Sequence, residues 1–214
     1  FLERYNIESG KKLKVIGRAG VGIDNIDVDA ATKNGIVVVN APTGNIIAAA
    51  EHTIALMLAL ARNVPQADGQ LKSGKWRREE FVGTEIRNKT LGIIGLGNVG
   101  SEVAKRVQAF EMRVIAHDPF VSKDYAHNLK VELVSMDQLL QESDFITLHV
   151  PLTATTARLI GRKELAKLKP TARIINCARG GVIDEEALLE AIKTGKIAGA
   201  AFDVFDHEPI TDSP

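Results

Sequence analysis

The chain after Lys89 alternates short apolar runs with segments whose apolar residues recur at helical spacing. Apolar runs of this length, set between polar turns, are typical of strands buried in a sheet. The strands predicted on this basis are Leu91–Ile94, Arg113–Ala116, Phe145–Leu148, Arg173–Ile175 and Ile197–Ala201. Because helical segments separate them, the sequence predicts an α/β fold with a doubly wound parallel sheet.

Two of the intervening segments carry clear helix signals. After Gly97, residues Val99, Val103 and Val107 stand four apart and form one apolar stripe. Asp184 is a favourable N-cap residue, and the acidic residues that follow it lie at the positive end of the helix dipole. We expect each helix to pack one face against the sheet.

The N-terminal part of the chain follows the same alternation. Val15-Ile16 predicts a short strand, and the next helix can be capped by Asp27 and ended by Asn34-Gly35. Ile36–Val39 predicts a second buried strand. Residues 1–43 are therefore expected to be a partial, smaller domain, and residues 44–214 a second domain.

The second domain is predicted to begin with a long helix over Asn45–Arg62, rich in Ala and Leu. Its apolar residues lie on several faces, more than a one-sided surface helix requires, which favours burial or a subunit contact. The more polar stretch Gln66–Lys89 is expected to form a helix and a connector. Glu51 and His52 interrupt the only long apolar run, so a membrane span is disfavoured.

Composition excludes several classes of function. The 214 residues are 45% hydrophobic and 25% charged, as in globular proteins, and 27 basic residues balance 27 acidic ones. A chain without net charge is a poor partner for nucleic acid or an anionic membrane. The single Cys177 cannot form an internal disulfide, which fits a reducing compartment. The ends, Phe1 and Pro214, indicate a fragment.

A glycine motif follows the first strand of the predicted sheet. Gly95, Gly97 and Gly100 form G-x-G-x-x-G at a strand-to-helix turn, with Asn98 and Val99 between the last two glycines. Gly95 can make the tight turn, Gly97 lets the backbone approach a diphosphate, and Gly100 lets the helix pack close to the strand. The helix N-terminus favours the anion. This pattern is typical of a Rossmann-type dinucleotide-binding domain.

Asp118 stands about 20 residues beyond the glycines, after the next strand. A carboxylate there can accept hydrogen bonds from both ribose hydroxyls and repels a 2′-phosphate, so NAD is favoured over NADP. The alternative is a glycine-rich turn in another α/β protein, with Asp118 merely ending a strand.

Further candidate residues follow the other strands. In an open parallel sheet, ligands bind outside the carboxyl ends of the strands. The candidates for contact with the cofactor or substrate are Gly95, Asp118, His149, Val150, Pro151, Cys177, Ala178, Arg179 and the segment from Asp203 to Glu208. We expect them to line one crevice. Arg179, beside two glycines, can bind a carboxylate or polarise a carbonyl. We predict no metal site.

These motifs together resemble the NAD-dependent D-2-hydroxyacid dehydrogenases. The resemblance rests on the glycine motif and on the segments 15–25, 40–45, 176–184 and 202–209. It implies NAD as the cofactor and a partial flavodoxin-like substrate domain in residues 1–43.

The resemblance also assigns catalytic roles. Arg179 is implied to bind the substrate carboxylate and carbonyl oxygen, and Glu208 to hydrogen-bond a catalytic imidazole. In the family this histidine comes later than Glu208-Pro209, in a loop that this sequence does not reach. His207 lies beside Glu208 but is expected to point elsewhere, and His149 is expected to border the cofactor. His52 is interpreted as a packed or subunit-contact residue.

The substrate loop of the family corresponds to the segment after the first strand. Its residues here are Arg18, Ala19, Gly20, Val21 and Gly22, and Asn45 belongs to the same candidate substrate site. Backbone N–H groups of the loop are implied to receive the carboxylate, since glycine allows close approach. Arg18 can add charge for a substrate phosphate. The alternative is a tight strand-to-helix turn with no ligand.

The resemblance is closest to family members that oxidise 3-phospho-D-glycerate to 3-phosphohydroxypyruvate, the first step of serine biosynthesis. The alternatives are a glyoxylate or hydroxypyruvate reductase, another D-2-hydroxyacid dehydrogenase, or a non-catalytic module that senses NAD. Since the long helix lies at a two-fold interface in the family, a homodimer or higher homo-oligomer is expected.

Overall fold

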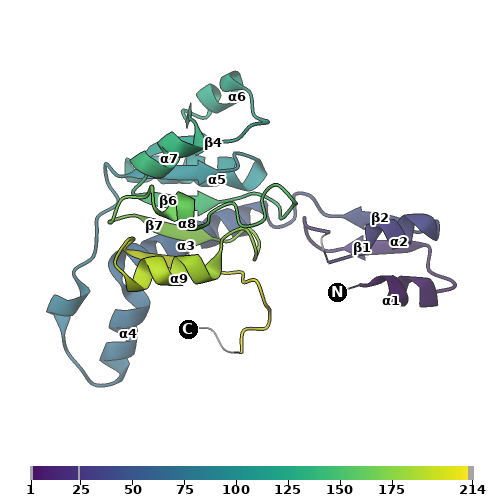
Figure 1. Cartoon of the computed structure of the whole chain (residues 1–214), viewed down its shortest axis with the longest axis horizontal. Coiled ribbons are helices and arrows are strands. Elements are labelled where there is room, and N and C mark those ends of the chain that lie inside the picture. Colours follow the sequence, from purple (N-terminus) through teal and green to yellow (C-terminus); the bar gives the residue numbers. More distant parts are fainter. Residues whose placement is uncertain (1, 24, 212–214) are drawn as a thin grey trace. The chain divides into compact units, whose positions relative to one another are not determined.

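The structure, a computed structural model, describes residues 2–23 and 25–211 and divides the chain into two compact units, residues 1–48 and 49–214. The smaller unit contains α1 (Arg4–Ser9), β1 (Val15–Arg18), α2 (Val28–Lys33) and β2 (Val37–Asn40) (Figure 1). Its two strands are parallel, and a small apolar cluster that includes Ile7, Ile16 and Ala31 forms its core. Asp27 caps α2, because its side chain accepts a hydrogen bond from the N–H of Ala30.

The second strand predicted in this unit forms, as β2, but the prediction that it is buried was wrong. Val37 and Val39 of β2 are 56% and 49% exposed. The register explains this difference, because Ile16 pairs with Val38 on the face that meets the core, while Val15 and Val37 share the opposite face. That opposite face is uncovered within this unit.

The larger unit is built on a six-stranded parallel sheet with the order β5-β4-β3-β6-β7-β8. The bounds are β3 (Thr90–Ile94), β4 (Arg113–His117), β5 (Glu132–Leu133), β6 (Phe145–Leu148), β7 (Arg173–Asn176) and β8 (Gly199–Phe202). The chain thus runs from the middle to one edge, then returns and continues to the other edge. This is the Rossmann strand order, and it confirms the predicted doubly wound sheet.

Two apolar clusters cover the two faces of this sheet. One contains residues of α3 (Ile46–Arg62) from Ala50 onwards and of α5 (Asn98–Val107). The other contains residues of α7 (Met136–Glu142), α8 (Arg162–Leu165) and α9 (Glu185–Lys193). Adjacent strand residues alternate between the clusters, so α3 and α9 lie on opposite faces of the strands (Figure 1). The short α6 (Lys123–Asn128) and η2 (Gln108–Phe110) complete the connections.

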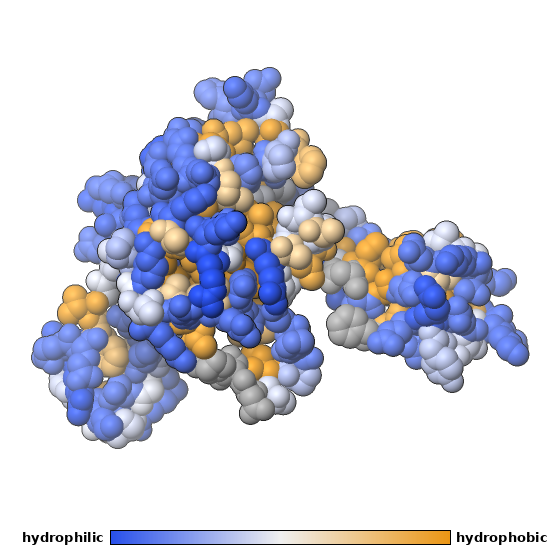
Figure 2. Space-filling view, viewed as in Figure 1, coloured by the Kyte–Doolittle hydropathy of each residue, from blue (hydrophilic) through white to orange (hydrophobic). Residues whose placement is uncertain are grey.

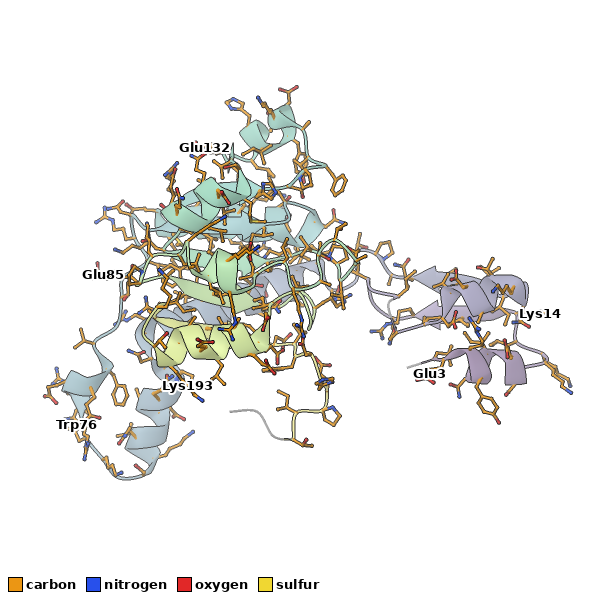
Figure 3. All side chains as sticks on the ribbon, viewed as in Figure 1. Glu3, Lys14, Trp76, Glu85, Glu132 and Lys193 are labelled. Atoms are coloured by element: carbon orange, nitrogen blue, oxygen red, sulfur yellow. The ribbon has the colours of Figure 1, made fainter. Side chains whose placement is uncertain are left out.

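A surface arm joins α3 to β3. It covers residues 64–82 and contains α4 (Val64–Lys72) and η1 (Arg78–Phe81), and neither helix has a buried residue. The helix predicted within Gln66–Lys89 is α4, which begins at Val64, two residues before the predicted stretch. Trp76, at 74% exposure, lies on this arm away from the strands (Figure 3). Apolar atoms are exposed among polar ones there (Figure 2).

Within residues 2–23 and 25–211, no single helix has both the length and the apolar character to cross a membrane. The pair α3 and α4 reaches that length together, but with a 64° bend between its helices.

Candidate functional site

The turn between β3 and α5 requires glycine at two positions for reasons of packing. Gly95 has φ +93°, and a Cβ there would lie 2.8 Å from the carbonyl oxygen of His149. A Cβ on Gly100 would overlap the carbonyl oxygen of Gly95. The first turn of α5 can therefore approach β3 only without a side chain at these positions.

Gly97 has no such packing requirement. A Cβ there would meet nothing within 4 Å, and its φ of −75° is open to any residue. Gly97 is also the N-cap of α5, and no side chain of the described residues caps that N-terminus. Backbone N–H groups at a helix N-terminus, next to open space that a Cβ would fill, fit a diphosphate.

Hydrogen bonds join the segments that follow three neighbouring strands. The N–H of Gly95 donates to the carbonyl of His117 at 3.0 Å, and the N–H of His149 donates to the carbonyl of Ile94 at 2.8 Å. The carboxylate of Asp118 accepts from the N–H of Leu96 at 2.8 Å. The structure thus brings Asp118, the glycine turn and the segment after β6 together.

The Asp118 carboxylate is well oriented. Its Oδ2 accepts from Leu96, and its Oδ1 accepts from the N–H of Phe120 at 2.8 Å. A carboxylate oxygen has two lone pairs, so each oxygen can accept one further hydrogen bond. This chemistry fits a ribose with two free hydroxyls.

His149 is held as a neutral imidazole. Its Nε2 lies 3.1 Å from Thr147 Oγ1, and burial lowers its pKa to about 4. A histidine with this pKa is uncharged at neutral pH and is a weak base. Val150, half-buried, packs over the Gly95 turn, and Pro151 is exposed.

The loop that carries Arg179 is fixed by a buried asparagine at the end of β7. Asn176 donates from Nδ2 to the carbonyl of Arg179 at 2.9 Å, and its Oδ1 accepts from the N–H of Ala178 at 3.0 Å. Arg179, half-buried, donates from Nη1 to the carbonyl of Ala178 at 2.6 Å. The nitrogen and the oxygen of the Asn176 side-chain amide therefore both hold the turn that presents the guanidinium.

The Arg179 loop lies directly on the segment that carries Glu208. A Cβ on Gly180 would overlap the carbonyl oxygen of Phe205, so the two backbones are in contact. Glu208 Oε1 accepts from the N–H of Phe205 at 3.0 Å, and Glu185 accepts from the N–H of Asp206 at 2.7 Å. The cationic loop and the acidic segment predicted to carry the chemistry are therefore neighbours.

At the ends of β7 and β8, α3 adds side chains that sequence reasoning did not place there. His52 Nε2 lies 3.3 Å from Asp203 Oδ1, and the Asp203 N–H donates to the carbonyl of Asn176 at 3.0 Å. Cys177 is half-buried, and burial raises the pKa of its thiol, although a hydrogen bond with Thr53 opposes this shift. His52, expected to be a packed or subunit-contact residue, is 48% exposed in its side chain within this chain, so it is not a packed core residue.

The candidate substrate loop, described within its own unit, is an ordered turn. Arg18 Nε donates to the carbonyl of Gly22 at 3.2 Å, and Asn40 Nδ2 donates to the carbonyl of Val21 at 2.7 Å. A Cβ on Gly20 would have no neighbour closer than 3.8 Å, so packing does not require glycine there. Ala19, Val21 and Asn45 are exposed.

Among the residues that the structure describes, no group of three or more His, Cys, Asp or Glu side chains could hold a metal ion.

Known sequences match most of this chain. The family model described as "D-isomer specific 2-hydroxyacid dehydrogenase, NAD binding domain" matches residues 54–214. A D-3-phosphoglycerate dehydrogenase of Synechocystis sp. is 58% identical over 207 residues, which cover 97% of this chain and 37% of that protein. One from Archaeoglobus fulgidus is 60% identical over 203 residues, covering 95% of this chain and 38% of that protein. The chain thus spans about two fifths of the length of these curated relatives.

Solved structures agree with this match. An NAD-dependent formate dehydrogenase from Staphylococcus aureus, in complex with NAD, has a TM-score of 0.89 and 34% identity, over 100% of this chain and 64% of that one. A glyoxylate reductase from Paecilomyes thermophila has a TM-score of 0.88 and 39% identity, over 98% of this chain and 64% of that one.

Proposed function

Because the chain belongs to the family of D-isomer specific 2-hydroxyacid dehydrogenases and contains their NAD-binding domain, we propose that its protein oxidises 3-phospho-D-glycerate to 3-phosphohydroxypyruvate with NAD. This reaction begins serine biosynthesis. The identity of 57–60% to three relatives named D-3-phosphoglycerate dehydrogenase supports this substrate. The observation that carries the proposal is the contact between the Arg179 loop and the Glu208 segment, beside the strand ends that form the glycine turn.

The cofactor site is formed by the segments after β3 and β4. Bound NAD supplies the acceptor for the hydride. The N–H groups of Asn98, Val99 and Gly100 bind the diphosphate, in the space left by the missing side chain of Gly97. Asp118 accepts hydrogen bonds from the ribose hydroxyls and repels a 2′-phosphate, which makes NAD the preferred dinucleotide.

His149, Val150 and Pro151 after β6, and Cys177, Ala178 and Asp203 after β7 and β8, border the same cofactor. His149 stays neutral at physiological pH, because burial lowers its pKa to about 4. It therefore lines the site and adds no charge to it.

Arg179 binds the substrate carboxylate and stabilises the negative charge on the carbonyl oxygen, because a guanidinium offers paired donors. Glu208 accepts a hydrogen bond from the imidazole of the family's catalytic histidine, which in the family lies beyond the residues of this sequence. This hydrogen bond raises the basicity of the imidazole, which takes the hydroxyl proton of the substrate. Residues 1–43 belong to the substrate-binding domain. There the loop from Arg18 to Gly22 receives the substrate, with Asn45 at the same site.

The arm supports a homodimer. Apolar side chains on it are exposed to solvent, whereas α3 buries Ala50, Ile54, Met57 and Ala61 within its own unit. The exposed residues are Val64, Leu71, Trp76 and Val82, at 53%, 58%, 74% and 82%. Exposed apolar groups of this size on a projecting segment favour association with a second copy. An enzyme of basal metabolism such as this one would act in the cytoplasm.

A turnover assay of the protein that carries this chain tests the proposal. With NAD, 3-phospho-D-glycerate should give a kcat/KM at least about tenfold above that of D-glycerate, since a site that pairs with a phosphate rejects the analogue that lacks it. Equal rates, or faster NADH-dependent reduction of glyoxylate, would reject the substrate. NAD binding without turnover of any 2-hydroxy acid would instead indicate a sensing module.

A further inference from the structure

We propose that His52 of α3 is a positioning residue, which holds the Asp203 carboxylate in place to accept a hydrogen bond from the carboxamide of the nicotinamide. This inference rests on the proposed function, and it adds to the site a residue from an element that precedes the whole sheet in sequence.

The main chain of Asp203 is fixed by a hydrogen bond to the neighbouring strand. Its N–H donates to the carbonyl of Asn176 at 3.0 Å, which fixes the backbone just after β8. The side chain still has two rotatable bonds. His52 Nε2, 3.3 Å from Asp203 Oδ1, restricts that freedom. Fixing a side chain before a ligand arrives reduces the ordering that binding must otherwise supply.

The contact stays accessible to a ligand. The side chains of His52 and Asp203 are 48% and 51% exposed. Asp203 can therefore accept a second hydrogen bond while His52 still holds it, because a carboxylate has about four acceptor sites.

His52 also stands on a rigid support. The residues beside it on α3, namely Ala50, Thr53, Ile54 and Met57, are all buried. Thr53 hydrogen-bonds Cys177, directly after β7, so α3 is attached to the same strand ends through a second contact. A side chain on a helix held in this way is a precise donor.

Strand order places this pair at the nicotinamide end of the site. The diphosphate binds at β3, and Asp118, after β4, holds the adenosine ribose on one side of β3. The dinucleotide crosses the crevice, so its nicotinamide extends to the side of β6, β7 and β8. The carboxamide is the N–H donor at that end of NAD, and a carboxylate is its natural acceptor. Arg179, the neighbouring charged residue, only donates.

Binding of three dinucleotides by the whole chain tests the proposal. NAD carries the carboxamide, 3-acetylpyridine adenine dinucleotide replaces it with a group that has no N–H, and ADP-ribose lacks the nicotinamide. Calorimetry would compare wild type with H52A and H52Q, and with H127A as a control that removes an exposed histidine of α6. Circular dichroism would confirm that each variant is folded.

We expect H52A to weaken NAD binding roughly fivefold to tenfold, which is the loss expected for one ordinary hydrogen bond between solvent-accessible groups. ADP-ribose and the acetylpyridine analogue should change by less than about twofold, which is within about 0.4 kcal/mol. H52Q, whose amide can donate to Asp203, should recover much of the loss, and H127A should bind as wild type. In a D203N background, H52A should cost nothing further.

Two results would overturn the role of His52 alone: an unchanged NAD affinity in H52A, or an equal loss for NAD and ADP-ribose, which would indicate a general effect of α3. A folded wild-type chain that binds neither NAD nor ADP-ribose would instead reject the proposed function, and this inference with it.

Discussion

Gly97→Ala tests whether glycine at this position is needed for NAD binding and not for the stability of the fold. A Cβ at this position would meet nothing within 4 Å, and the φ of −75° suits alanine. Alanine restricts the unfolded chain, which raises the free energy of unfolding by about 0.4–1 kcal/mol. It is also a poorer N-cap than glycine, which lowers the free energy of unfolding by a similar amount. The free energy of unfolding should therefore stay within about 0.5 kcal/mol of wild type, and the melting temperature within about 2 °C.

NAD binding should respond differently to the same change. The added methyl group would occupy the space assigned to the diphosphate and weaken at least one hydrogen bond to a charged oxygen, which contributes about 1.5–3 kcal/mol. We expect Kd for NAD to rise roughly 10- to 100-fold. Calorimetric titration measures Kd, and thermal unfolding without ligand measures stability.

Gly100→Ala is the matched control, because its Cβ would overlap the carbonyl oxygen of Gly95. Overpacking of this kind costs about 1–3 kcal/mol, so this variant should be destabilised even without NAD. The reasoning is refuted if Gly97→Ala binds NAD within about twofold of wild type, or if it is destabilised as much as Gly100→Ala.

Three other predictions concern the substrate, pH and assembly. Arg179→Lys should lower kcat/KM at least about tenfold but leave NAD affinity unchanged, because lysine cannot bind a carboxylate in bidentate fashion; equal losses in both would contradict the role. Burial lowers the pKa of His149 from 6.5 to about 4, so its contribution to stability is complete above pH 6.5 and is lost as pH falls toward 4. Urea unfolding should show a loss of up to about 3 kcal/mol over that range, reduced in His149→Gln; identical pH profiles would refute it. Trp76→Glu should shift the protein from dimer to monomer in light scattering, and an unchanged mass would remove the arm from the interface.

The fold could be predicted where one periodicity dominates. Apolar runs at β3, β4, β6 and β7 gave the central strands, since residues buried on both faces leave a continuous apolar pattern. β5 was missed because it has only two residues and depends on pairing with Ile115 and Ala116 of β4. β8 begins at Gly199 rather than Ile197, because Ile197 packs into the core before the ladder starts.

The site residues that could be predicted from the sequence are those that directly follow a strand. Asp118, Arg179 and the glycine turn follow from the rule that ligands bind beyond the carboxyl ends of parallel strands. The contact of His52 with Asp203 joins α3 to β8 across the fold, and local sequence carries no signal for it. The role of Asn176 did have a signal in the local sequence, because an asparagine at the start of a turn often hydrogen-bonds the backbone that follows it.

Calorimetric titration of the folded chain with NAD and with NADP tests the central claim most directly. The account predicts one site for NAD and an affinity for NADP at least about tenfold lower, because the Asp118 carboxylate repels the 2′-phosphate. Asp118→Ala should weaken NAD and remove most of that preference. Folded protein that releases no binding heat with NAD, or that binds both dinucleotides equally well, would contradict it.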